Sequence, residues 1–215
     1  MECAIFDMDG TLINSESAYY RVWEELIESE GYLLTKDFYK TILGCPTNQI
    51  RQQFLDHFGG NFPFETLFAR FMKKRNEMIQ KGDFQLTRGI SEFLGYCQKK
   101  SIVCGVATSS HKEEATTLLK KMEIFDFFTF FAFGDEVTTG KPNPEIFELA
   151  VQRSGFFKDE IIVFEDSKNG VIAANSANLS VYLVNDFIPL ESEYEDLAEH
   201  TFKNFSQVTD KLEEL

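Results

Sequence analysis

Positive charge is scarce in this chain of 215 residues. Its 21 lysines and arginines are outnumbered by 35 aspartates and glutamates, which gives a formal net charge of −14. This imbalance argues against broad binding to nucleic acid or to an anionic membrane surface. It does not exclude a small phosphorylated metabolite, because a bound metal ion and one lysine can reverse the field locally. We therefore expect neither a nucleic-acid nor a membrane partner.

Cysteine is also scarce, and long apolar runs are absent. The four cysteines form no C-x-x-C pair, which favours free thiols in a reducing compartment over disulfides or a cysteine-bound metal. No apolar run is long enough to span a bilayer, and no basic region precedes an apolar stretch at the N-terminus. We expect a cytoplasmic monomer.

Short apolar runs alternate with helical patterns over most of the chain. This alternation predicts an α/β fold, a doubly wound, Rossmann-like and mainly parallel sheet. The runs typical of buried strands are 3–8, 102–108, 128–133, 161–164 and 181–184, and the helical patterns between the later ones are 89–100, 112–122, 144–154 and 170–176. The acidic segment 186–200 has the composition of a surface loop.

The first connection is too long for an ordinary crossover, since about 90 residues separate the first two predicted strands. Within it, apolar residues such as Phe54, Leu55 and Phe58 recur at helix spacing. We therefore expect a helical cap domain, residues 15–82, inserted into a core domain formed by 1–14 and 83–215. The phenylalanines of this insert are expected to form its own core.

Two aspartates, Asp7 and Asp9, follow the first predicted strand directly. Residues i and i+2 of an extended chain point to the same side, so both carboxylates can converge at the bend that Gly10 permits. Unpaired carboxylates would repel each other there, and a hard cation such as Mg²⁺ relieves that repulsion through oxygen ligands. The segment therefore predicts a metal-dependent active site.

Polar groups also follow the other predicted strands. In an open α/β sheet, ligands bind beyond the carboxyl ends of the strands, so these groups should converge on one site. A hydroxyl with backbone amides at a helix start suits a phosphate, and a lysine suits its charge. The groups are Thr108, Ser109 and Ser110 after the second strand, Lys141 after the third, and Glu165 and Asp166 after the fourth.

Each of these groups also has a structural interpretation. Ser110 and Glu113 fit a capping box, so Ser110 could start a helix. Asn143 and Pro144 fit the N-cap and first turn of the next helix, which would leave Lys141 on the surface. Glu165 and Asp166 could cap the helix that follows them. Capping and phosphate binding are compatible, because a cap places backbone amides at the site.

The order Asp-x-Asp-Gly-Thr, Thr/Ser, Lys-Pro and Glu-Asp resembles the four motifs of the haloacid dehalogenase superfamily. The segments 6–11 and 140–144 are similar to its branch of type 1 capped phosphatases and β-phosphoglucomutases. The resemblance covers nearly the whole chain, and the helical insert begins where the cap of that branch enters.

The resemblance implies a role for each group. Asp7 would be the nucleophile, and Asp9 the general acid and base. Thr108, Ser109, Ser110 and Lys141 would bind the phosphoryl oxygens. Mg²⁺ would be held by Asp7, the main-chain carbonyl of Asp9 and Asp166, with Glu165 as a further direct or water-mediated ligand.

The resemblance favours a phosphatase of a sugar or polyol phosphate over a phosphosugar mutase. The histidine that mutases of the branch carry in the first cap helix is absent, and Thr47 stands where they carry an arginine. The expected specificity residues of the cap are Tyr19, Tyr20, Gly44, Thr47 and Arg51, with Arg51, one helical turn after Thr47, as the candidate to replace the missing arginine. The mutase remains an alternative, as does a signalling receiver domain that stores a phosphoryl group on an aspartate.

Overall fold

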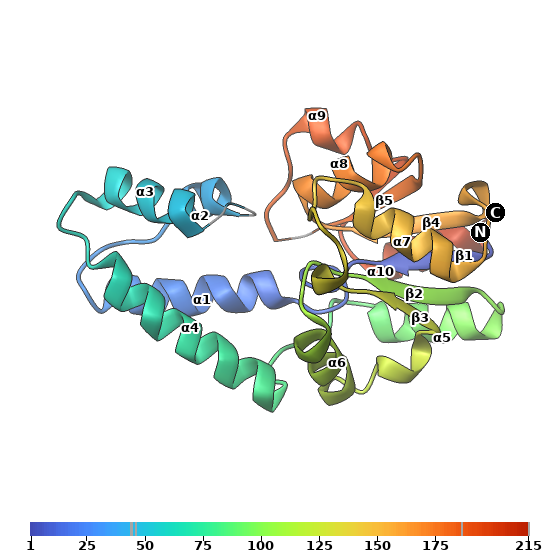
Figure 1. Ribbon diagram of the computed structural model, residues 1–215, viewed down its shortest axis with the longest axis horizontal. Coiled ribbons are helices and arrows are strands. Elements are labelled where there is room, and N and C mark those ends of the chain that lie inside the picture. The colour runs from blue at the N-terminus through green and yellow to red at the C-terminus, as the bar shows by residue number, and fades with distance from the viewer. Residues whose placement is uncertain (44, 46, 186, 215) are drawn as a thin grey trace.

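A six-stranded sheet runs through the computed structural model, which describes residues 1–43, 45, 47–185 and 187–214 (Figure 1). Its strands lie in the order β3-β2-β1-β4-β5-β6, and every neighbouring pair is parallel. The order reverses between β1 and β4, where such sheets place their ligands. The strands are β1 (Cys3–Phe6), β2 (Val103–Ala107), β3 (Phe130–Ala132), β4 (Ile161–Glu165), β5 (Ser180–Val184) and β6 (His200–Phe202).

Both faces of the sheet are covered by helices, which confirms the doubly wound α/β prediction. Alternation along β1 sends Ala4 and Phe6 to one apolar cluster and Cys3 and Ile5 to the other. The first cluster includes residues of α5 (Ile90–Lys99), α6 (Lys112–Lys121) and α10 (Phe205–Glu213), and the second includes residues of α7 (Glu145–Ser154) and α8 (Lys168–Ser176).

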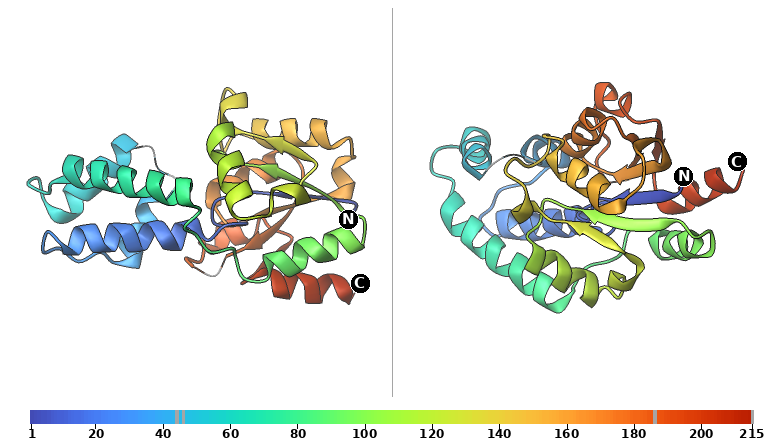
Figure 2. Two further views of the ribbon diagram at one scale, coloured as in Figure 1. Left: turned by 90° about the horizontal axis from the view of Figure 1, so that it is seen from below. Right: turned by 45° about the vertical axis from the view of Figure 1, so that its right-hand side comes forward.

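The long first connection is helical, as its periodicity predicts. Its four helices extend from the carboxyl edge of the sheet (Figures 1 and 2). Their apolar faces form a third cluster, in which Trp23 stacks on Phe71 with ring centroids 4.6 Å apart. We call residues 15–82 the helical insert; it contains α1 (Ser15–Glu28), α2 (Lys36–Ile42), α3 (Thr47–Phe58) and α4 (Phe64–Lys81).

Contacts on two sides hold the insert against the sheet domain. Arg75 of α4 makes a bidentate ion pair with Glu114 of α6. On the opposite side, Ile188 is buried in the insert's apolar cluster, and the Phe187 ring meets Tyr20 at 5.8 Å. The insert therefore lies over the carboxyl edge of the sheet.

The structure differs from the sequence-based expectations mainly where one segment meets another. The predicted loop 186–200 contains the short helix α9 (Ser192–Glu195) and leads into β6. β6 is a three-residue edge strand, too short to give a recognisable alternation. The described residues also include three single-turn 3₁₀ helices: η1 (Phe125–Phe127), η2 (Gly134–Glu136) and η3 (Lys158–Glu160).

Two of the structural interpretations as helix caps differ from the caps in the structure. The α6 amide of Lys112 is bonded by the Asp135 carboxylate, and Ser110 turns elsewhere. The N-cap of α7 is Pro144, one residue later than predicted, while Asn143 accepts the Glu145 amide. Tertiary contacts outside the local sequence window decide the Ser110 case.

The four cysteines are free thiols, as expected, and three of them are buried. Within the described ranges, no helix combines the length and apolar character needed to cross a membrane.

Candidate active site

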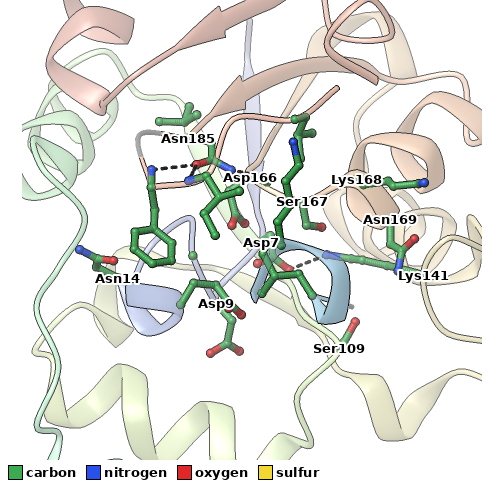
Figure 3. Close-up of a pocket in the computed structure, with 18 of the residues that line it drawn as sticks. Asp7, Asp9, Asn14, Ser109, Lys141, Asp166, Ser167, Lys168, Asn169 and Asn185 are labelled. Atoms are coloured by element: carbon green, nitrogen blue, oxygen red, sulfur yellow. Dashed lines mark hydrogen bonds and ion pairs between the residues drawn. The ribbon is translucent and has the colours of Figure 1, made fainter. Parts of the chain in front are cut away.

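The carboxyl ends of β1, β2, β4 and β5 meet at one pocket of about 770 Å³ between the sheet and the insert. We call its sheet side the core floor: Asp7, Asp9, Thr108, Ser109, Lys141 and Asp166. We call its insert side the insert wall: Glu16, Lys40, Thr41, Leu43, Cys45 and Gln49. Figure 3 shows how the labelled side chains of the core floor converge.

Lys141 links three elements of the core floor. Its Nζ donates to Asp7 Oδ1 at 2.5 Å, to Glu165 Oε1 at 2.6 Å and to the Ala107 carbonyl at 3.2 Å. Burial opposes the charge of this ammonium, but Asp7 and Glu165 raise the pKa of Lys141 above its usual value. Lys141 is therefore a buried, charged group and not the surface lysine of the structural interpretation.

Asp7 is the acid at the centre of the site, 7% exposed at the end of the middle strand β1. Burial raises the pKa of Asp7 to about 8, although the Lys141 ammonium opposes the shift, and the charge of Glu165 adds to it. A carboxylate in this position needs a further positive charge to stay ionised at neutral pH.

Glu165 holds Lys141 from beneath. It is fully buried, and its second oxygen accepts the amides of Asp166 and Ser167 and the Ser167 hydroxyl. A Cβ at Gly170 would collide with the Glu165 carboxylate, so the helix that follows must carry glycine there. Both Glu165 oxygens thus have protein donors already, which suits a positioning role.

Asp166 faces Asp7 across the turn after β1. Burial and the charges of Glu165 and Asp7 raise its pKa, and Thr11 Oγ1 donates to Asp166 Oδ1 at 3.0 Å. Gly10 has a φ of 87°, and a Cβ there would collide with the Asp166 carboxylate. Glycine at this position therefore lets the backbone pass directly beside the acid.

Asp9 turns away from the other acids (Figure 3). Its Oδ2 accepts a hydrogen bond of 2.9 Å from Ser110 Oγ, which is what Ser110 does instead of capping α6. Burial raises the pKa of Asp9, while the Ser110 hydrogen bond and the charge of Arg75 lower it. Asp7 and Asp9 therefore occupy different surroundings although they are two residues apart.

The loop after β2 presents hydroxyls and amides to the pocket. Thr108 is buried, and its Oγ1 accepts the Ser110 amide at 3.1 Å, which closes a tight turn. Ser109 lines the pocket beside Lys141 (Figure 3). This turn brings Thr108 and Ser109 to the side of the core floor that lines the pocket.

The structure places four of the expected specificity residues away from the pocket's polar surface. Tyr19 packs on Phe71 and Phe84, and Tyr20 packs on Tyr39 and Phe187, both in the insert's apolar cluster. Arg51 pairs with Glu65 at 2.6 Å on the surface, and Thr47 is an exposed first residue of α3. The fifth, Gly44, lies outside the described residues.

Other residues reach the pocket that the sequence reasoning did not single out. Glu16, in the first turn of α1, accepts a 3.3 Å hydrogen bond from the Tyr39 hydroxyl, and burial together with the charge of Asp9 raises its pKa to about 7. Asn185 follows β5 and donates to the Asp166 carbonyl at 2.7 Å. Its place directly after a predicted strand was the available signal.

The acids of the core floor suit a cation. One oxygen each of Asp7, Glu165 and Asp166 lie within 4.8 Å of one another. The cluster has three buried carboxylates and one ammonium, Lys141, which pairs with Asp7 and Glu165, so negative charge is in excess. All the donor atoms are oxygens, which hard divalent cations prefer. The residues present therefore fit a metal ion, with Asp7 and Asp166 as the acids whose pKa values are raised.

Known proteins resemble the chain in sequence and in fold. The family model described as haloacid dehalogenase-like hydrolase matches residues 4–184. A phosphorylated carbohydrates phosphatase of Thermotoga maritima is 32% identical over 86% of this chain and 88% of its own, and a (DL)-glycerol-3-phosphatase of Arabidopsis thaliana is 28% identical over 91% and 83%. A solved structure from Thermotoga maritima, provisionally assigned as a β-phosphoglucomutase, is 29% identical, covers both chains fully and has a TM-score of 0.80.

The matched region contains all four strand-end motifs, from Asp7 to Asp166. It also contains the whole helical insert, and the match therefore includes both sides of the pocket. The chain belongs to the haloacid dehalogenase-like hydrolases and is an enzyme of that superfamily.

Proposed function

We propose that the enzyme is a Mg²⁺-dependent phosphatase of small phosphorylated metabolites, in particular sugar or polyol phosphates. The observation that carries the proposal is the separation of two acids on the core floor. Asp7 is ion-paired with Lys141 beside Asp166, whereas Asp9 is turned toward Ser110. The phosphatases among the similar proteins support the same chemistry.

In this proposal Asp7 and Asp9 divide the reaction. An Asp7 oxygen attacks phosphorus and forms an acyl-phosphate bond while the ester P–O bond breaks. Asp9 gives its proton to the leaving alcohol oxygen, and its raised pKa favours the protonated form that this step requires. Asp9 then removes a proton from the water that attacks the aspartyl phosphate, which releases inorganic phosphate and restores Asp7.

Lys141, Thr108 and the amides around Ser109 would bind the phosphoryl oxygens. Lys141 Nζ already donates its three protons to Asp7, Glu165 and the Ala107 carbonyl. Binding of a phosphoryl oxygen therefore requires Lys141 to exchange one of these partners. Asp7, the Asp9 main-chain carbonyl and Asp166 would hold Mg²⁺, with Glu165 positioning Lys141. The metal would supply positive charge for the phosphoryl oxygens, as metals do throughout this family.

The helical insert would act as a cap that excludes water during transfer. Its ion pair with α6 and the burial of Ile188 hold it over the pocket. We assign residues 15–82 to this cap and the remainder to the core.

A mutase is not favoured. Such an enzyme must hold a second phosphate, and Arg51, the arginine expected to serve, is committed to Glu65.

The test is a panel of phosphorylated metabolites assayed with Mg²⁺, scored for phosphate release and for isomerisation. We expect phosphate release from sugar or polyol phosphates, and loss of that activity when EDTA removes the metal. Isomerisation of hexose 1- and 6-phosphates faster than phosphate release would refute the phosphatase assignment. A long-lived phospho-Asp7 without turnover would indicate a phosphoryl switch instead.

A further inference from the structure

The insert wall of the pocket carries a carboxylate where a binder of a second anion would need a cation. The wall residues are Glu16, Thr41, Leu43, Cys45 and Gln49, together with Lys40. Apart from Glu16 and Lys40 these side chains are uncharged. The part of a substrate that extends away from the core floor must be recognised by these groups.

The one lysine of this wall is already paired. Lys40 Nζ donates to the Pro189 carbonyl at 2.8 Å and lies 3.1 Å from Glu191 Oε1, both in the segment after β5. Moving a phosphate out of water requires cations or donors that replace its hydration, and a paired lysine replaces it poorly. Lys40 therefore serves the contact between insert and core.

The other cations near the pocket do not belong to the insert wall. Within the described part of the insert, Arg51 pairs with Glu65 and Arg75 with Glu114. Lys168 and Lys203 also line the pocket, but they are exposed residues of the sheet domain, and the Lys168 ammonium lies 4.0 Å from the Tyr194 ring centre. These two lysines can attract an anionic substrate to the pocket mouth from the side of the sheet domain.

Glu16 is placed to accept hydrogen bonds from a substrate. It stands at the start of α1, next to Asp9 in the pocket, and the Tyr39 hydroxyl fixes one of its oxygens. A carboxylate can accept several hydrogen bonds, so capacity remains for hydroxyl groups. Protonated or ionised, the group offers no positive charge to an anion.

We propose, on the basis of the phosphatase function above, that the pocket selects monophosphate esters of neutral polyhydroxy compounds and discriminates against bisphosphates. Glu16 is the residue that determines this choice. It binds a hydroxyl of the leaving group and repels a second phosphate. Tyr39 positions Glu16 for that contact.

The experiment compares matched substrate pairs: fructose 6-phosphate with fructose 1,6-bisphosphate, and glucose 6-phosphate with glucose 1,6-bisphosphate. We expect wild-type kcat/KM to be higher for both monophosphates. Glu16→Gln should lower the monophosphate values about tenfold, as loss of a charged hydrogen bond to a substrate hydroxyl does. Glu16→Lys should raise the ratio of bisphosphate to monophosphate kcat/KM by about tenfold or more, and Tyr39→Phe should shift it least.

Hydrolysis of p-nitrophenyl phosphate, which has no hydroxyl or second phosphate on its leaving group, measures the chemistry alone. Glu28→Gln and Glu28→Lys, on the exposed side of the same helix, are the matched controls and should leave every ratio unchanged. The inference is overturned if wild type prefers the bisphosphates. It is also overturned if both Glu16 variants keep the wild-type ratios while they hydrolyse p-nitrophenyl phosphate. A wild-type enzyme inactive on every ester would instead refute the proposed function, and this inference with it.

Discussion

The core floor and the insert wall of the same pocket differ in how their polar groups are held. On the floor, the side chains of Lys141 and Asp7 are almost completely buried, and Lys141 bonds to Asp7, to the buried Glu165 of β4 and to the Ala107 carbonyl of β2. On the wall, Thr41 of α2 and Gln49 of α3 are exposed to solvent, and Lys40 is partly exposed. A reaction centre needs fixed geometry, whereas a recognition surface can change without disturbing it.

The largest effect should come from removing the proposed nucleophile. Asp7→Asn preserves the shape of the side chain but cannot form the aspartyl phosphate, so phosphate release should fall roughly 10⁴-fold or more. Steady-state assays together with circular dichroism would check that the fold survives. Activity near the wild-type level in a folded Asp7→Asn protein would show that the core floor does not act through this residue.

A second substitution tests whether the ion pairs of Lys141 on the core floor contribute both to activity and to stability. Lys141→Met leaves Asp7 and Glu165 buried without their ammonium. Activity should fall roughly 10²- to 10³-fold and the free energy of unfolding by about 3 kcal/mol, the typical cost of breaking a buried ion pair. Denaturant melts at pH 8 would measure the second effect. Lys168→Met, at an exposed lysine of the same pocket, should change stability little. Equal losses of stability in Lys141→Met and Lys168→Met would contradict the expected difference between the buried and the exposed lysine.

The pH dependence of stability tests the insert wall. The folded-state pKa of Glu16 is raised to about 7 from an ordinary 4.5, so the unfolded chain loses this proton first. The free energy of unfolding contributed by Glu16 should therefore fall as pH rises from about 4.5 to about 7. Relative to Glu16→Gln, wild type should lose about 2–3 kcal/mol over that window. Parallel unfolding curves from pH 4 to 8 would contradict the environment described for Glu16.

The smallest effect should come from the contact that joins wall to floor. Arg75 and Glu114 are partly exposed, so a double-mutant cycle with Arg75→Met and Glu114→Gln should give a coupling free energy of about 1 kcal/mol. Because the pair holds the insert in place, KM should rise a few-fold with a smaller change in kcat. The reversed pair, Arg75→Glu with Glu114→Arg, should recover part of the loss. A KM unchanged by Arg75→Met, by Glu114→Gln and by the two combined would show that this ion pair does not hold the insert over the pocket.

Much of the core floor could be predicted because its residues are sequence-local to strand ends. Asp7, Thr108, Lys141 and Asp166 each follow an apolar run, and parallel strands must end at one edge. The same reasoning would have reached Asn185, which follows β5. The role of Ser110 could not be read this way, because a capping box and a bond to Asp9 look identical in sequence.

The insert wall was harder to predict because helix periodicity does not say which neighbour covers each face. Tyr19 and Tyr20 lie in the first helix after the turn that follows β1, yet their rings pack on Phe71, Phe84 and Phe187 from distant segments. Arg51, one helical turn after the expected position at Thr47, had the right charge for a distal phosphate, and Glu65 of the next helix pairs with it. Glu16, by contrast, faces the pocket because the turn of α1 directs it there.

The sequence by itself determined the fold class, the position of the insert and the acids of the core floor. Local patterns suffice for these, since strand alternation, helix periodicity and strand-end motifs each span only a few residues. Only the tertiary structure decided which cations are paired with acids, which tyrosines are buried and which carboxylate of the insert lines the pocket. Those outcomes depend on burial and on partners far away in the chain. A charged side chain can bind a ligand only where no protein partner already pairs with it.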